Sequence, residues 1–395
     1  MHGLKKAAPA DAGLCPERTQ RIVQVLQRDV DRGRLPGAAV LVSRRGRVVL
    51  DATVGRLDPA RESPMRSDAI FRIYSMTKPV VSVAAMMLVE QGRLLLSDPV
   101  GQYIPGFMKQ QVAVPSPQGI RLGPAVRPAT VQDLLRHTAG LTYEFTGNDH
   151  VNQLYSQAGL GDRQQTNAEL CERLAALPLA HQPGTTWAYS RATDVLGRVI
   201  EVVTGQTLGA FLREAILQPL GMNETGFFVP PEQHHRIAEA FEHDPDGGAQ
   251  MPMHDPREVP ALEMGGGGLM STVHDYARFL QCLCNGGELD GQRLLSPHTL
   301  AWMTADHLGN AIAHTDNPLL PPGHGFGLGV AVRTAAGLAP VPGSVGTWHW
   351  SGIGGTHFFV DPAQELFAIF MAQAPNQRVF YRSMMRGLVY GALVH

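Results

Sequence analysis

The chain has 395 residues, with 33 basic and 35 acidic side chains and a hydrophobic content of 44%. This length favours two domains, or one large α/β unit with an insertion. The net charge of −2, without a basic stripe, argues against a nucleic-acid partner, and no apolar run reaches the roughly 20 residues of a membrane span. No apolar segment of a secretory signal follows Lys5 and Lys6, so a cytoplasmic protein without membrane contact is expected.

The first half of the chain alternates between helical and extended patterns. Apolar spacing predicts helices, and alternation on both sides of a turn at 44–46 predicts two antiparallel strands. The stretch 105–130 is rich in Pro and Gly and is interpreted as a loop. The expected elements are a helix over 16–32, strands over 37–43 and 47–53, a helix over 79–90, and helices over 131–137, 167–177, 192–204 and 208–217.

The second half begins with an irregular segment over 229–268 and ends in strands. The expected elements are helices over 273–283 and 296–303, strands over 325–333, 347–350, 357–361 and 365–373, and a helix over 378–393. Early strands that pair with late ones form one antiparallel sheet flanked by helices, an α+β fold. We predict a sheet domain from 1–74 and 255–395 and an inserted, mainly helical domain over 75–254, with the active site at their interface.

Ser75 and Lys78 stand three residues apart at the start of an apolar helix, so their side chains share one face. In the first turn, unpaired N–H groups and the helix dipole favour a developing alkoxide on Ser75. Apolar neighbours would partly desolvate Lys78 and favour the neutral amine, which accepts a proton. Only four of the 33 basic residues are lysines, and arginine could not act as a base. The pair predicts a nucleophile of the Ser–Lys type; a surface lysine is the alternative.

A second candidate block is the stretch Pro183–Arg191. A Pro-Gly turn delivers Tyr189 from a loop just before the helix at 192. A tyrosine beside a cationic lysine can have its phenolate favoured, and it can then relay or accept the proton of Ser75. The alternative is a half-buried loop tyrosine. Asp194 either orients this region or caps the following helix.

The third block is His349–Gly355, a strand that ends in small residues. Such a strand can lie along an ester, and its glycines let the backbone approach closely. We expect the backbone N–H groups of Ser75 and Ile353 to form the oxyanion hole. An ordinary strand–turn–strand segment would look the same.

Other catalytic arrangements have weaker support. His137, His349 and His357 raise the possibility of a Ser–His–Asp hydrolase, but none of the 14 serines lies in a Gly-x-Ser-x-Gly elbow. The histidines at 234, 235 and 243 lack the helical spacing of metal ligands, so no metal site is expected.

The three blocks, in this order, resemble the serine β-lactamase and penicillin-binding-protein superfamily. Within it they resemble class C β-lactamases and, above all, family VIII carboxylesterases. The framing stretches 92–100, 134–141 and 266–272 agree, and the resemblance covers roughly residues 15 to 390. It implies a mixed α/β domain with a helical insertion and a reaction without a cofactor. It also implies Ser75 as the acylated nucleophile, Lys78 as the base and Tyr189 as the second proton carrier.

Two departures from the family pattern concern substrate binding. The Lys-Thr-Gly motif of β-lactamases is here Trp350-Ser351-Gly352. Tryptophan cannot supply the positive charge of that lysine, but it offers an apolar wall for an uncharged group. The Tyr-Ser-Asn motif ends in Arg191, which either restores a positive charge or faces solvent. Residues 350–352 and Arg191 are the predicted substrate contacts.

These features together predict a serine carboxylesterase that hydrolyses short-chain neutral esters of small molecules. The alternatives with the same nucleophile are a β-lactamase, a D-amino-acid peptidase or amidase, and an acyltransferase. A non-catalytic binding protein is a third class, against which the complete set of Ser75, Lys78 and Tyr189 argues. The natural ester and the oligomeric state are left open.

Overall fold

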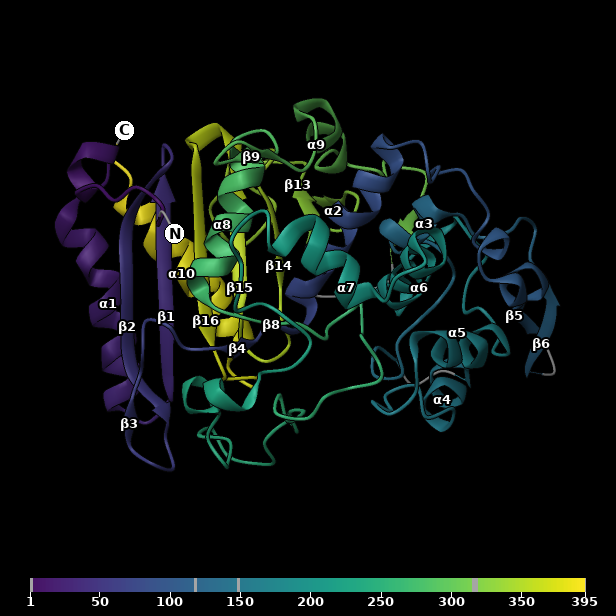
Figure 1. Ribbon diagram of the computed structural model, residues 1–395, viewed down its shortest axis with the longest axis horizontal. Coiled ribbons are helices and arrows are strands. Elements are labelled where there is room, and N and C mark those ends of the chain that lie inside the picture. The colour runs from purple at the N-terminus through teal and green to yellow at the C-terminus, as the bar shows by residue number, and fades with distance from the viewer. Residues whose placement is uncertain (1–2, 117–118, 148–149, 315–318, 395) are drawn as a thin grey trace.

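The computed structural model describes residues 3–116, 119–147, 150–314 and 319–394. Its centre is an eight-stranded sheet in the order β12-β13-β14-β15-β16-β1-β2-β3 (Figure 1). Every neighbouring pair of strands in it is antiparallel. Its strands are β1 Gly37–Arg44, β2 Arg47–Asp58, β3 Ser63–Pro64, β12 His324–Phe326, β13 Ala331–Arg333, β14 Trp348–Ser351, β15 His357–Asp361 and β16 Leu366–Ala372. The early strand β1 pairs with the late strand β16, which confirms the predicted α+β fold.

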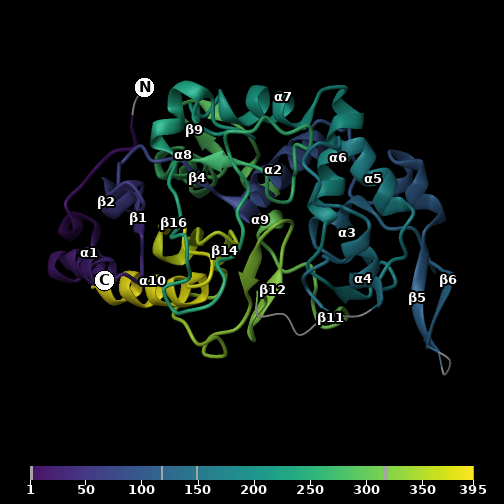
Figure 2. The same ribbon diagram turned by 90° about the horizontal axis from the view of Figure 1, so that it is seen from below.

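Helices cover both faces of this sheet. Successive side chains of a strand point to opposite faces, so each face presents its own apolar side chains to a layer of helices. Val40 and Val42 of β1 pack in one apolar cluster with α1 (Pro16–Asp31) and α10 (Arg378–Ala392). Ala39 and Leu41 point the other way, into the cluster that includes α8 (Val273–Cys284). Figure 2 shows α1 and α10 on one side of the strands and α8 on the other.

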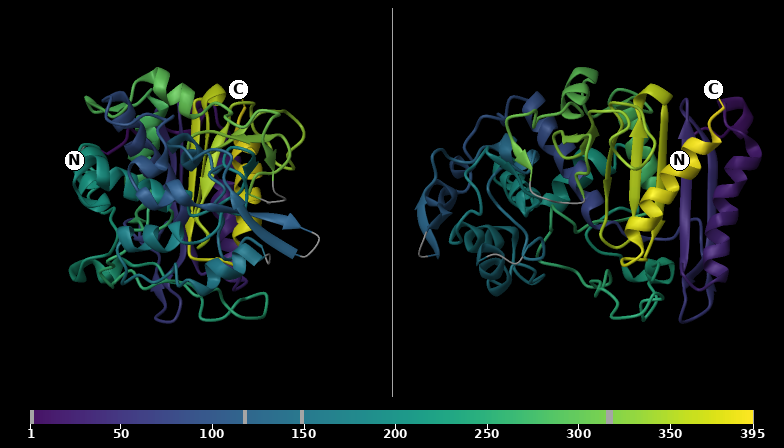
Figure 3. Two further views of the ribbon diagram at one scale, coloured as in Figure 1. Left: turned by 90° about the vertical axis from the view of Figure 1, so that its right-hand side faces the viewer. Right: turned by 180° about the vertical axis from the view of Figure 1, so that it is seen from behind.

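The helical part lies at the opposite end of the molecule from α1 (Figure 3). It contains α3 Val131–Leu135, α4 His150–Gln157, α5 Asn167–Ala175, α6 Ala192–Thr204 and α7 Leu208–Leu212, which runs into a π-helical turn at Arg213–Leu217. The apolar helix α2 (Thr77–Glu90) packs against α6, and one continuous cluster joins α2, the sheet and α6. The two predicted domain ranges stay a prediction.

Two expected segments have a different structure. The stretch 105–130, expected as a loop, contains a hairpin of β5 (Gln111–Ser116) and β6 (Gly119–Pro124). The strand expected over 325–333 is split into β12 and β13 by a tight turn, in which Gly327 N donates to Val330 O at 2.8 Å. Gly329 has φ +101° in this turn, and a Cβ atom there would lie 2.1 Å from Ser82 Oγ. The remaining strands and α-helix are short: β4 Phe71–Arg72, β7 Thr186–Trp187, β8 Met270–Ser271, β9 Glu288–Leu289, β10 Gln292–Arg293, α9 Pro297–Met303 and β11 Ala313–His314. Short 3-10 helices lie at Pro9–Ala12, Val100–Gln102, Pro105–Lys109 and Pro362–Gln364.

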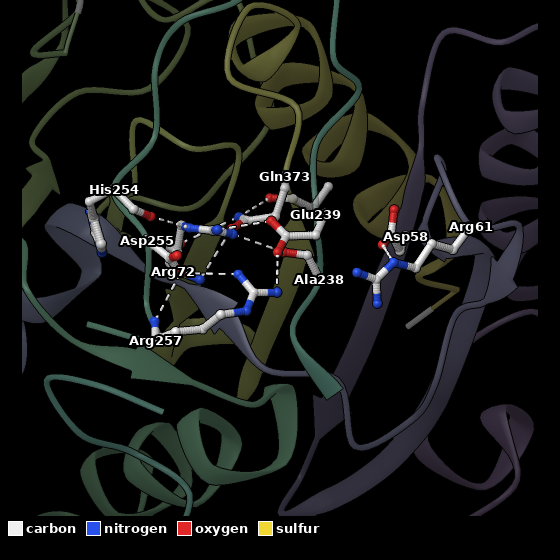
Figure 4. A network of polar contacts seen from close by, with 10 residues as sticks. Asp58, Arg61, Arg72, Ala238, Glu239, His254, Asp255, Arg257 and Gln373 are labelled. Carbon is white, nitrogen blue, oxygen red and sulfur yellow. Dashed lines mark hydrogen bonds and ion pairs between the residues drawn. The ribbon is translucent and has the colours of Figure 1, made fainter. Parts of the chain in front are cut away.

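The segment 229–268 has only one short helical stretch, at 231–236, and a buried arginine ties the segment to strand β4 (Figure 4). Arg72 of β4 donates to His254 O at 2.7 Å and to the Glu239 carboxylate at 2.8 Å. The Gln373 side chain accepts from Arg72 N at 3.2 Å and donates to Arg72 O at 3.4 Å. These bonds fix the strand that leads directly into the predicted nucleophile.

Among the residues that the structure describes, no single helix is long and apolar enough to cross a membrane. The helices 192–204 and 208–217 reach that length and hydropathy only when taken together, and the chain bends by 78° between them. In the same residues, no group of three or more His, Cys, Asp or Glu side chains is arranged to hold a metal ion.

Candidate active site

A strained turn places Ser75 just before the N-terminus of α2. Tyr74, Ser75 and Met76 form a 3-10 turn that ends where α2 begins, so Ser75 precedes the helix instead of lying in its first turn. Tyr74 has φ +44°, a left-handed conformation that costs of order 1–3 kcal/mol in a bulky residue. Its half-buried ring packs edge-on against His254 at 5.0 Å between ring centres. Packing on the 229–268 segment therefore holds the turn in this shape.

The structure brings the three predicted catalytic side chains together. The Tyr189 hydroxyl donates to Ser75 Oγ at 2.6 Å, and Lys78 Nζ donates to the same oxygen at 3.3 Å. Lys78 Nζ also lies 4.6 Å from the centre of the Tyr189 ring. Each of the two predicted proton carriers is thus within hydrogen-bond reach of the predicted nucleophile.

Lys78 is fully buried, and three acceptors surround its nitrogen. Besides Ser75 Oγ, Nζ donates to Gly266 O at 2.7 Å and to Tyr143 OH at 3.0 Å. A protonated lysine has three donors, so this arrangement satisfies the ammonium completely. The sequence analysis considered only the apolar neighbours of Lys78 and did not anticipate these hydrogen bonds.

Tyr143 is a site residue that the sequence analysis missed. Burial raises the pKa of its hydroxyl well above the usual value, and nearby Tyr189 and Asp194 raise it further. It therefore stays a neutral phenol that can accept from Lys78. Its one sequence signal is its position two residues after the framing stretch 134–141.

Arg191 points away from the pocket, into the protein. It is 3% exposed, its Nε donates to Glu144 Oε2 at 3.2 Å, and its NH1 lies 3.6 Å from Asp194 Oδ2. Burial opposes its charge, but Asp194 and Glu144 outweigh burial and raise the pKa of Arg191. Arg191 therefore neither faces solvent nor lines the pocket, where it was expected as a substrate contact.

Asp194 links this ion pair to Lys78. Its Oδ1 accepts from Gly266 N at 2.7 Å, and the carbonyl of Gly266 is an acceptor for Lys78. The α6 helix has no side-chain N-cap bond, so of the two roles considered for Asp194 the orienting one fits the geometry. Burial raises the pKa of Asp194, and Arg191 and Lys78 oppose that rise.

The pocket has a volume of about 480 Å³, and Ser75 and Tyr189 line it. Of the third block, Trp350, Ser351 and Ile353 also line it, and the Trp350 ring meets the Tyr189 ring edge-on at 5.3 Å. The third block therefore forms a wall beside the nucleophile.

Gly352 has a packing role instead of a place on the pocket wall. A Cβ atom at this position would lie 2.3 Å from Ile73 O, in the backbone that leads to Ser75. The glycine therefore allows β14 to approach the nucleophile segment closely.

The predicted oxyanion hole has suitable surroundings. Ser75 and Ile353 both line the pocket. In the described part of the chain, no backbone carbonyl accepts a hydrogen bond from either of their N–H groups. Two such donors beside the nucleophile are what a tetrahedral intermediate requires, and the assignment stays a prediction.

The histidines considered for a Ser–His–Asp site lie elsewhere. His137 is buried beside Ser190, with its Nδ1 3.2 Å from Ser190 Oγ, and burial and Lys78 lower its pKa well below the usual value. His349 and His357 line the far end of the pocket. There they lie beside arginines of α10 that the sequence analysis did not consider.

A half-buried serine on a pocket wall, in contact with a lysine and a tyrosine, has the arrangement expected of a site for acyl transfer through a serine nucleophile. The sequence model of the Beta-lactamase family matches residues 22–387, so the chain belongs to this family.

Individual relatives support the esterase branch. The chain is 33% identical over 373 residues to Esterase EstB of Burkholderia gladioli, covering 89% of both chains. It is 28% identical over 375 residues to the Lovastatin esterase of Penicillium rubens, covering 88% of this chain and 91% of the relative. The solved structure of EstCE1, a hydrolase with promiscuous acyltransferase activity, aligns with a TM-score of 0.79 at 28% identity, covering 95% of this chain and 99% of the other. The predicted resemblance to family VIII carboxylesterases is confirmed.

Proposed function

We propose that the chain is a serine carboxylesterase that works through an acyl-enzyme on Ser75. The observation that carries this proposal is the position of Ser75 Oγ, 2.6 Å from Tyr189 OH and 3.3 Å from Lys78 Nζ on the wall of a pocket. The similarity to EstB, which is named as an esterase, supports the same reaction.

In the acylation step, the bond from Ser75 Oγ to the ester carbonyl carbon forms while the proton of Ser75 passes to the Lys78–Tyr189 pair. The carbonyl oxygen becomes negative and is held by the N–H groups of Ser75 and Ile353. The bond to the leaving alcohol then breaks, and the pair returns the proton to that alcohol. In deacylation, water takes the place of the alcohol and the steps run in reverse order.

For the reacting end of the substrate we propose an uncharged, short acyl group. Trp350 stands on the pocket wall where β-lactamases have a lysine, and its apolar surface suits a neutral group. The same replacement disfavours β-lactams and D-amino-acid peptides as substrates. Transfer of the acyl group to an alcohol is a second candidate reaction, since the acyl-enzyme is common to both, and EstCE1 is described as having that activity.

The proposal is tested by hydrolysis of p-nitrophenyl butyrate and nitrocefin, with added 1-butanol to detect transfer. Ser75→Ala is expected to lower butyrate turnover by at least about 10³-fold, while the exposed Ser97→Ala is the matched control and keeps wild-type rates. Mass spectrometry of the quenched reaction should show the butyryl group on Ser75. Ser75-independent butyrate turnover would overturn the proposal, and fast nitrocefin turnover would favour the β-lactamase alternative.

A further inference from the structure

The far end of the pocket carries several positive charges. Arg378, Arg382 and Arg386 follow one another at every fourth position of α10, and all three line the pocket. The helix itself contains no Asp or Glu between residues 378 and 392. Residues four apart share a helix face, so the three guanidinium groups point the same way.

The innermost of these arginines is buried without a partner. Arg386 is 3% exposed, and within the described residues its NH1 and NH2 atoms have no hydrogen-bond acceptor. Its guanidinium lies 5.1 Å from the centre of the Phe359 ring. The nearby carboxylate of Asp361 is already bound by Ser344 N at 3.1 Å and by the Tyr390 hydroxyl.

Arg382 adds a second charge to this end of the pocket. Its NH2 donates to Gly352 O at 2.6 Å, and its Nε has no acceptor among the described residues. Burial lowers the pKa of Arg382 and of Arg386 to about 10, so both remain charged at neutral pH. Asp361 interacts favourably with the charge of Arg386, but among the described residues neither arginine forms an ion pair with a carboxylate. Buried charges without a directly bonded anion are costly, and this cost is lowered when an anion binds between them.

Three histidines complete the lining with neutral hydrogen-bonding groups. In the part of the chain that the structure describes, His324 Nε2, His349 Nδ1 and His357 Nε2 are buried and have no partner. The ring centres of His324 and His349 are 5.3 Å apart, and those of His349 and His357 are 6.0 Å apart. Burial, with Arg386 nearby, lowers the pKa of all three, so they add hydrogen-bonding nitrogens without further charge.

The pocket is continuous from these groups to the nucleophile. Ser351 connects the two ends, because it lines the pocket and its Oγ lies 2.8 Å from His357 Nδ1. On the strand, Trp350 and Ser351 point to opposite faces of β14, so the apolar wall and the charged end belong to different parts of one cavity.

We propose that Arg386, Arg382 and the adjoining histidines form an anion subsite that binds a free carboxylate of the ester substrate. The inference rests on the proposed esterase function. A planar guanidinium presents paired donors that match the two oxygens of a carboxylate. The preferred substrate is then an ester that is neutral at the scissile bond against Trp350 and carries a carboxylate at its distal end. This replaces the expectation of a wholly neutral ester.

Two pairs of substrates test the subsite on either side of the scissile bond. For the acyl side, p-nitrophenyl hemiglutarate is compared with the uncharged p-nitrophenyl 4-carbamoylbutyrate. For the alcohol side, 4-acetoxybenzoate is compared with 4-acetoxybenzamide. In at least one pair, kcat/KM of the wild-type enzyme is expected to be at least about tenfold higher for the anion.

Variants of Arg386 show whether the preference depends on this group. Arg386→Met is expected to bring the ratio of anionic to neutral kcat/KM close to one, and Arg386→Lys, which keeps the charge, to retain part of it. Arg198→Met, on the outer side of α6, is the matched control and keeps the wild-type ratio. A ratio is used because it cancels a general loss of activity. If Arg386→Met does not fold, the ratio measured with the wild-type enzyme alone decides whether the pocket prefers an anionic ester.

A binding measurement separates this inference from the proposed function. Ser75→Ala cannot turn over the ester, so calorimetric titration with glutarate reports the subsite directly. If butyrate is hydrolysed through Ser75 but neither pair shows a preference and glutarate does not bind, the subsite is refuted and the esterase remains. If glutarate binds through Arg386 while no ester is hydrolysed, the subsite remains and the esterase proposal fails.

Discussion

Replacing Arg191 by methionine tests whether this buried guanidinium organises the site or contacts the substrate. Its partners are Glu144 and Asp194, and Asp194 in turn holds the backbone of Gly266, which accepts from Lys78. Methionine fills a similar volume without the charge. The substitution therefore leaves Asp194, with a side chain only 1% exposed, without its cationic partner.

The expected loss of stability follows from this burial. Removing one partner of a buried ion pair typically costs about 3–5 kcal/mol. Unfolding entropy is about 2.1 cal/mol/K per residue, which for a chain of this length gives a fall in Tm of roughly 4–6 °C. The matched control is Arg198→Met on the same helix, where a half-buried pair with Glu201 at 3.0 Å should contribute no more than about 1 kcal/mol.

Thermal unfolding followed by circular dichroism gives Tm, and initial rates with p-nitrophenyl butyrate and p-nitrophenyl hemiglutarate give kcat and KM. We expect a lower Tm for Arg191→Met and a lower kcat for both esters, because Gly266 is no longer held against Lys78. An unchanged Tm together with a raised KM for the anionic ester alone would refute this reasoning. Arg191 would then be a substrate contact, as the sequence suggested.

Two further predictions concern proton transfer and pH. Tyr189→Phe removes the hydroxyl 2.6 Å from Ser75 Oγ and should lower kcat for p-nitrophenyl butyrate by about 10²–10⁴-fold in steady-state assays; an unchanged kcat would show that Tyr189 carries no proton. His274 is 3.1 Å from Asp51, and this hydrogen bond raises the pKa of His274 above 6.5. Its stabilisation is complete below that value and is lost as pH rises through the raised pKa, so His274→Gln should lower Tm more at about pH 5.5 than at about pH 9. Equal losses at both pH values would contradict this assignment.

Local geometry made part of the site predictable. Ser75 and Lys78 are three residues apart at a helix start, so their contact follows from helix geometry even though Ser75 lies just before α2. Tyr189 was predicted from the ability of a tyrosine beside a lysine to carry a proton, and from the order of the three blocks. Tyr143 could not be found in this way, because it meets Lys78 across 65 residues and no spacing rule connects the two.

The same distinction explains the errors in the fold. The alternation of apolar and polar residues that predicted β1 and β2 is a property of each strand by itself, and the structure has both strands at the predicted places. The hairpin at 111–124 was hidden by Pro115 and by two glycines, which resemble a loop when counted by composition. The turn at 327–330 depends on the close approach of Gly329 to Ser82 of α2, a contact that composition does not reveal.

The sequence by itself determined the antiparallel sheet and the helical middle, and it predicted Ser75 as the nucleophile with Lys78 and Tyr189 as its proton carriers. Periodicity and short spacings encode these, because they depend on backbone geometry over a few residues. The tertiary structure alone decided which groups surround Lys78, that Arg191 turns inward, and that Arg386 lines the pocket without an ion-pair partner among the described residues. Those outcomes depend on side-chain directions and on partners brought from distant parts of the chain, which only the packed fold fixes.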